Sequence, residues 1–159
     1  MNIGPRGLSG GGCRETRTVK RKGVYHEVSG ALMRALSVAE ACREFAADAT
    51  AIGKLAKPMA STMHRSADQA ARQIRDALDR LTPPAIPADL LKCLMDAIVD
   101  LETLGELALL AVSYELTAKN AVHLAHGLRY SADRTVETLH RANRLLRDAA
   151  GGAVGGGGV

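Results

Sequence analysis

Residues 82–112 read TPPAIPADLLKCLMDAIVDLETLGELALLAV, and this stretch decides the fold. Its prolines break any helix that precedes them, because proline lacks the backbone N–H and disfavours helical geometry in the residue before it. Pro87 suits the first position of a new helix, and Asp89 follows in the first turn of that helix. We therefore expect a helix over residues 88–113.

The apolar residues of this stretch recur in steps of three and four, which places them on one face of a helix. They are Leu91, Leu94, Ile98, Leu101, Gly105, Ala108 and Val112. Gly105 would let a neighbouring backbone approach closely. Other leucines lie outside this stripe: Leu90, Leu104, Leu107, Leu109 and Leu110. Such a wide apolar surface predicts either self-association or a central helix that is fully buried.

Three more segments show helical spacing, at residues 30–57, 59–81 and 117–149. Their apolar stripes are Ala35, Val38, Cys42, Phe45, Ala49, Ile52 and Ala56; Met59, Met63, Ala67, Ala70, Ile74, Ala77 and Leu81; and Ala118, Ala121, Ala125, Leu128, Ala132, Leu139, Ala142, Leu146 and Ala149, with Thr135 in the same phase. Pro58 is expected to separate the first two segments, or else to kink one longer helix.

The boundary between the last two helices has two candidate positions. The phase of the apolar stripe changes near residues 113–117, which predicts a break there. Alternatively, Gly127 ends a long third helix and Ser131 caps a short fourth one. We prefer the first division, because four helices of comparable length suit an antiparallel bundle.

The chain is therefore expected to form one all-α domain, an antiparallel four-helix bundle over residues 30–149. Of the 159 residues, 47% are hydrophobic but only 3% are aromatic, and alanine fills many stripe positions. Such helices pack closely but bury little area each, so stability would need a partner. Residues 1–29, a basic arm, and residues 150–159, a Gly-rich tail, lack apolar periodicity and are expected to be flexible.

Cys13, Cys42 and Cys93 show none of the close pair spacings of zinc or redox motifs, and their odd number fits a reducing compartment. No apolar run is long enough to cross a bilayer. The sequence therefore predicts a cytoplasmic protein with no membrane partner. Glu137 and His140 form a Glu-x-x-His motif without the second such motif that a di-metal bundle needs, so no metal and no cofactor is expected.

Charge is sorted along the chain behind a formal net charge of +4. The arm and the outward face of the last helix are basic, and both are candidate sites for nucleic-acid phosphates. The candidate residues are Arg14, Arg17, Lys20, Arg21, Lys22, Lys119, His123, Tyr130, Arg134, Arg141 and Arg144. The third helix is acidic, with Asp89, Asp96, Asp100, Glu102, Glu106 and Glu115. These acids could meet the last helix of the same chain, that of a neighbouring copy, or a basic partner.

Arg134 and His140, with five residues between them, resemble the loose Arg-to-His spacing of the HEPN ribonucleases, whose small helical domains dimerise. The resemblance implies a metal-independent ribonuclease in which Arg134 would bind phosphate and His140 would act in acid–base chemistry. Thr135 follows the arginine here and departs from the residue that is common at that position in the family.

The leading interpretation is a non-enzymatic assembly subunit that contacts the backbone of RNA or DNA within a larger nucleoprotein complex. In size, helical character and basicity the chain resembles the helical small subunits of CRISPR effector complexes, which implies stacked copies along a nucleic-acid channel. It is similar in the same respects to helical accessory proteins of retroelement reverse transcriptases. The two alternatives are a ribonuclease that uses Arg134 and His140 and a pure protein–protein scaffold.

Overall fold

The computed structural model describes residues 12–81 and 86–152, with side chains from Tyr25 onward within these ranges. It contains four helices: α1 (Gly12–Ile52), α2 (Lys57–Asp79), α3 (Ala88–Ser113) and α4 (Ala118–Gly152). No strand occurs in these residues. The predicted all-α four-helix bundle is therefore confirmed.

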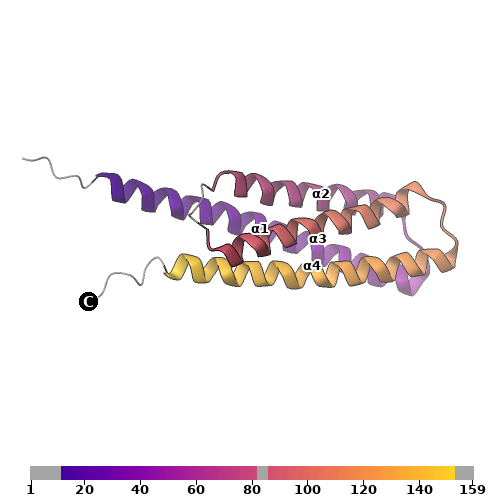
Figure 1. The fold of residues 1–159 in the computed structure, drawn as a ribbon. Helices are drawn as coiled ribbons and strands as arrows, with labels where there is room; N and C mark the ends of the chain where they lie inside the picture. Colours follow the sequence, from indigo (N-terminus) through magenta and orange to yellow (C-terminus); the bar gives the residue numbers. More distant parts are fainter. Residues whose placement is uncertain (1–11, 82–85, 153–159) are drawn as a thin grey trace, which may run out of the picture.

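Consecutive helices run antiparallel and pack in a ring (Figure 1). α1 packs against α2 and α4, and α3 packs against the same two helices from the other side. Because α3 is one member of a ring, it keeps an outer face. Leu109 and Leu110 on α3 are 40% and 43% exposed, so α3 is not the fully buried central helix that its leucines could also have indicated.

The boundaries on both sides of α3 agree with the sequence analysis. α3 spans residues 88–113 as predicted, and Asp89 lies in its first turn. α4 begins at Ala118 and continues without interruption through Gly127 and Ser131. The alternative division at those two residues is thereby excluded, and the break lies where the apolar phase changes.

The connection between α1 and α2 differs from the prediction, because α1 ends at Ile52 and not at Lys57. The next residue, Gly53, has φ 71°, a left-handed conformation that glycine adopts without strain and that commonly ends helices. Its N–H still donates to the Ala49 carbonyl oxygen at 2.9 Å. Pro58 lies in the first turn of α2, where its missing N–H removes no helical hydrogen bond. The glycine, and not the proline, terminates the helix.

Alanine at Gly53 is expected to lower the free energy of unfolding by about 1 kcal/mol, because φ 71° is strained for alanine. Alanine at Gly127 is expected to raise it by about 0.5–1 kcal/mol, because this glycine lies inside α4 and an added Cβ meets no atom within 4 Å. Urea denaturation followed by circular dichroism measures both variants. If the two variants changed the free energy of unfolding in the same direction, the role given to Gly53 would be contradicted.

α1 begins at Gly12, so part of the arm predicted over residues 1–29 is helical, whereas its flexibility stays a prediction. Core contacts begin within the predicted arm, at residues 25 and 28. Val28 is fully buried, and Tyr25 packs against the same cluster. Val28 and Leu32 are four residues apart on one helix face. The buried face of α1 therefore extends into the segment that its composition predicted to be an arm.

The two chain ends lie mostly beyond the described residues. α4 continues to Gly152, so the first residues of the predicted Gly-rich tail are helical. The rest of that tail, at 153–159, and the first part of the predicted arm, at 1–11, lie outside the described residues. The flexibility predicted for those two segments therefore stays a prediction.

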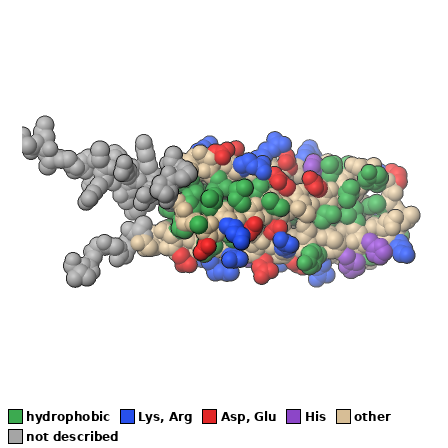
Figure 2. Space-filling view, in the orientation of Figure 1, with side chains coloured by type: hydrophobic (Ala, Val, Ile, Leu, Met, Phe, Trp, Pro, Cys, Tyr) green, Lys and Arg blue, Asp and Glu red, His purple; other side chains and the backbone are tan. Residues whose placement is uncertain are grey.

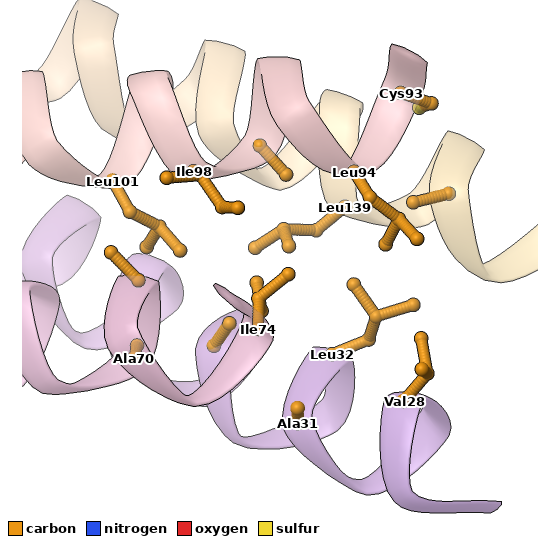
Figure 3. Close-up of a cluster of buried hydrophobic side chains, with 14 of the residues drawn as sticks. Val28, Ala31, Leu32, Ala70, Ile74, Cys93, Leu94, Ile98, Leu101 and Leu139 are labelled. Atoms are coloured by element: carbon orange, nitrogen blue, oxygen red, sulfur yellow. The ribbon is translucent and has the colours of Figure 1, made fainter. Parts of the chain in front are cut away.

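The core consists of two adjoining clusters of buried side chains along the bundle, each with members from all four helices. In Figure 3, Leu32 of α1, Ile74 of α2, Leu94 of α3 and Leu139 of α4 point toward one another. Each of these side chains is at most 1% exposed. The exceptions to the predicted stripes lie near helix ends: Ile52, Ala56, Met59, Leu91 and Ala118 are exposed.

α2 and α3 approach closely where small residues face each other. An ideal Cβ added to Gly105 would lie 3.5 Å from the Ala67 Cβ and 3.5 Å from the His64 carbonyl oxygen. His64 Nδ1 lies 3.0 Å from the Gly105 carbonyl oxygen, to which it donates in the tautomer that carries hydrogen on Nδ1. The close approach predicted at Gly105 is therefore present.

Each helix buries one face and leaves charged side chains on the other. Within the described ranges, the buried polar residues are Asp100, Ser131 and Thr135. Asp100 accepts a hydrogen bond from Thr138, and Thr135 donates one to the Ser131 carbonyl oxygen. No helix in this part of the chain combines the length and the apolar character that crossing a bilayer requires.

Candidate nucleic-acid interface on α4

The inward face of α4 determines which side chains point away from the bundle. Almost all of the predicted stripe is buried, including Leu128, Leu139 and Leu146. Thr135 is fully buried as well, and its Oγ1 donates to the Ser131 carbonyl oxygen at 2.7 Å. Because Thr135 satisfies its hydroxyl within the helix, this polar residue can occupy a core position without breaking the stripe.

The opposite side, which we call the outer face of α4, carries cations together with two acids. Its members are all exposed: Lys119, His123, His126, Tyr130, Glu137, Arg141, Arg144 and Asp148. Lys119, Arg141 and Arg144 make no ion pair with any described residue. Tyr130 is 73% exposed, so its ring is available for stacking. Figure 2 shows Lys, Arg and His side chains along the edge formed by α4, with Asp and Glu side chains among them.

Arg134 differs from the other predicted cations, because it has an acidic partner. Its Nε lies 3.2 Å from Asp100 Oδ1 on α3, and Thr138 Oγ1 donates to Asp100 Oδ2 at 2.7 Å. Asp100 is only 7% exposed. Removing Arg134 would leave a buried carboxylate without a counterion, so this residue supports the α3–α4 contact.

The acids of α3 do not form one continuous surface. Asp100 turns toward α4, Glu102 pairs with Arg75 of α2 at 2.6 Å, and Glu115, just after α3, pairs with Lys57. The hydrogen bond from Lys57 lowers the pKa of the Glu115 carboxyl group below its usual value. Three acids stay exposed without an ion pair among the described residues: Asp89, Asp96 and Glu106.

The acids of α3 therefore leave most of the positive charge of α4 unneutralised. Only the pair of Arg134 with Asp100 joins a described α3 acid to an α4 cation. Asp133 of α4 is turned to the other side, where its carboxylate lies 3.8 Å from Arg43 of α1. α4 also carries the exposed acids Glu137 and Asp148, so its surface holds charges of both signs.

The predicted basic residues near the chain start fall on the first turns of α1. Arg14, Arg17, Lys20, Arg21 and Lys22 belong to this helix, and their side chains lie outside the described set. Because α1 and α4 pack side by side and run antiparallel, the first turns of α1 and the last turns of α4 lie at the same end of the bundle (Figure 1). The fold thus brings both basic segments to one end.

The two residues of the ribonuclease hypothesis lie on one helix but do not face the same side. Six residues of helix correspond to a rotation of about 120° between Arg134 and His140. Arg134 lies beside α3 with Asp100, and His140 is exposed without a hydrogen bond to a described residue. Within one copy the structure therefore does not bring the predicted catalytic pair together.

The described thiols are buried and free. Burial raises the pKa of the Cys42 thiol to about 12, and its Sγ lies 3.1 Å from Met63 Sδ. Burial also raises the pKa of Cys93, although the charges of Arg141 and Arg144 act in the opposite direction. Among the described residues no group of three or more His, Cys, Asp or Glu could hold a metal ion.

The sequence analysis left open whether the acids of the third helix meet the last helix of the same chain, and Asp100 does so. Its position offered a signal: Ala97, Asp100 and Leu104 follow a three-four step, and the two apolar members are fully buried. An acid in phase with a core row needs a cation or a hydroxyl nearby. In this chain Arg134 and Thr138 of α4 supply both.

Comparison with known proteins adds no relative: no protein family, no curated protein and no solved structure matches this chain.

Proposed function

We propose that this protein is a non-enzymatic helical subunit that binds the sugar–phosphate backbone of a nucleic acid through the outer face of α4, as part of a larger cytoplasmic nucleoprotein assembly. The observation that carries the proposal is the set of exposed cations on α4, Lys119, Arg141 and Arg144, that have no acidic partner in the described chain. Cations of this kind bind nucleic acid by neutralising phosphates and releasing counterions.

The outer face of α4 is long enough for such a ligand. From Lys119 to Arg144 it extends about 37 Å, at ~1.5 Å per residue, with Lys119 at one end and Arg141 and Arg144 at the other. One turn of a duplex extends over about 34–36 Å, so the cations at the two ends lie about one turn apart. Tyr130 lies between them and offers an exposed ring to an unpaired base.

A rigid helix adds an advantage over a flexible arm. α4 is held by a buried stripe along most of its length, so its cations are fixed relative to one another before binding. Fewer side chains and no backbone need to be ordered on binding, which lowers the entropic cost. The basic residues at the start of α1 lie at the end of the bundle where α4 finishes and would extend the same surface.

Replacing both Arg141 and Arg144 by alanine is expected to weaken binding to RNA and DNA regardless of sequence. The slope of log Kobs against log salt should fall by about 2, because two phosphate contacts are lost. Fluorescence anisotropy of a labelled oligonucleotide, single-stranded and duplex, across a salt series measures the slope.

The matched control replaces Arg65 and Arg72, two exposed arginines of α2, by alanine. It changes the net charge by the same amount on another helix. Equal losses of slope in the two double variants would contradict a site on α4, and absence of binding by the unaltered chain at low salt would contradict nucleic-acid binding altogether. Cleavage of RNA that is lost in His140→Ala would instead support the ribonuclease hypothesis.

A further inference from the structure

The outer face of α3 is unusually apolar for a surface helix. We define it by Lys92, Met95, Val99, Thr103, Glu106 and Leu110, all of which are exposed. Met95, Val99 and Leu110 are 50%, 56% and 43% exposed. Figure 2 shows hydrophobic side chains gathered on the face of the bundle where α3 lies in front. Contiguous exposed apolar side chains with charged neighbours are typical of contact surfaces.

The charges on this face are arranged symmetrically about Val99. Lys92 precedes Val99 by seven residues and Glu106 follows it by seven, which is close to two helical turns in each direction. Neither Lys92 nor Glu106 makes an ion pair within the described chain. Their charges are opposite, so each is available for a partner that presents the other.

We propose that the outer face of α3 binds the same face of a second copy of this chain, with the two α3 helices antiparallel about a twofold axis at Val99. Such an axis places residues equally far before and after Val99 at the same level of the contact. Lys92 of each copy then meets Glu106 of the other, so one pair of residues forms two intermolecular ion pairs. Val99 packs against its own symmetry mate, and Met95 lies beside Thr103.

The same geometry positions the two cationic surfaces. α3 has α2 along one side and α4 along the other. A twofold axis perpendicular to the antiparallel helices keeps like sides together, so both α4 helices lie on one side of the dimer and both α2 helices on the other. The dimer thereby presents two α4 outer faces to one ligand. This consequence rests on the proposed function, whereas the dimer itself does not.

Sedimentation equilibrium of the full chain without nucleic acid tests the dimer, over roughly 1–100 µM. The mass is expected to approach twice the 16.7 kDa of one chain. Lys92→Glu and Glu106→Lys should each raise the dimer Kd by about tenfold or more, because like charges then meet at both symmetric positions. The combined swap, K92E with E106K, should restore the dimer, because it reverses both charges of each pair.

Val99→Glu should yield a monomer with unchanged helical content, because Val99 is exposed in the single chain. Arg65→Glu, on the outer side of α2, is the matched control and should leave the mass unchanged. A monomeric unaltered chain at the highest concentration, or a double swap as weak as its single variants, would overturn the proposal. The salt dependence of nucleic-acid binding is measured separately, so a failure of either claim is distinguishable from a failure of the other.

Discussion

Replacing Leu101 by alanine is expected to lower the free energy of unfolding by about 2–5 kcal/mol. Leu101 is fully buried on α3, and Figure 3 shows its side chain in the same core cluster as Ile98 and Ala70. The deletion removes apolar contact and leaves a cavity that rigid helices fill only partly. Domains of this kind are typically stable by about 5–15 kcal/mol, so the loss is a large fraction of the total.

Urea denaturation at one fixed protein concentration measures this loss, because any association would make stability concentration-dependent. Leu109→Ala is the matched control on the same helix, since Leu109 is 40% exposed and should cost less than about 1 kcal/mol. The alanine-rich core sharpens the contrast. Alanine side chains are too short to extend into a cavity, so the few leucines and isoleucines of the core carry most of the buried area. Similar losses in the two variants would contradict the core described here.

Replacing Arg134 by alanine is expected to lower the free energy of unfolding by about 1–3 kcal/mol, because the buried Asp100 carboxylate loses its cationic partner. Thr138 would still donate to Asp100, which keeps the loss below that of an entirely unpaired charge. Adding Asp100→Asn to Arg134→Ala should recover most of the stability, since no buried charge is then left. Thermal or urea unfolding of the two single variants and the double variant measures this coupling.

Arg141→Ala is the control for charge alone, because Arg141 has no ion pair in the described chain; it should change stability by less than about 0.5 kcal/mol. If Arg134→Ala is equally neutral, the pair with Asp100 contributes nothing to the fold. The comparison matters for the proposed function. A loss of nucleic-acid binding in an Arg134 variant is informative only after its structural effect is known.

The parts of the fold that the sequence predicted well are those set by local rules. The third helix is bounded by a proline cluster and by a change of apolar phase, and both signals act within a few residues. The α4 stripe is nearly continuous, so its inward face followed directly from helical spacing. In each case the local signal and the tertiary packing agree.

The errors arise where a local signal competes with another or depends on distant contacts. Gly53 and Pro58 both mark a helix end, and the glycine prevails because a proline is tolerated in the first turn of the next helix. Val28 is buried against the other helices, so the segment just before residue 30 belongs to the bundle, which composition does not reveal. The contact of Asp100 with Arg134 was one of three alternatives left open for the acids of the third helix, because the only signal in the sequence is one acid in a core phase.

The most direct test of the central claim is the affinity of charge-reversed chains for a labelled oligonucleotide at one low salt concentration. Arg141→Glu with Arg144→Glu reverses the outer face of α4, and Arg65→Glu with Arg72→Glu makes the same charge change on α2. The proposed function predicts at least about a 100-fold weaker binding for the first variant and a much smaller change for the second. Equal affinities for the two variants would contradict a nucleic-acid site on α4.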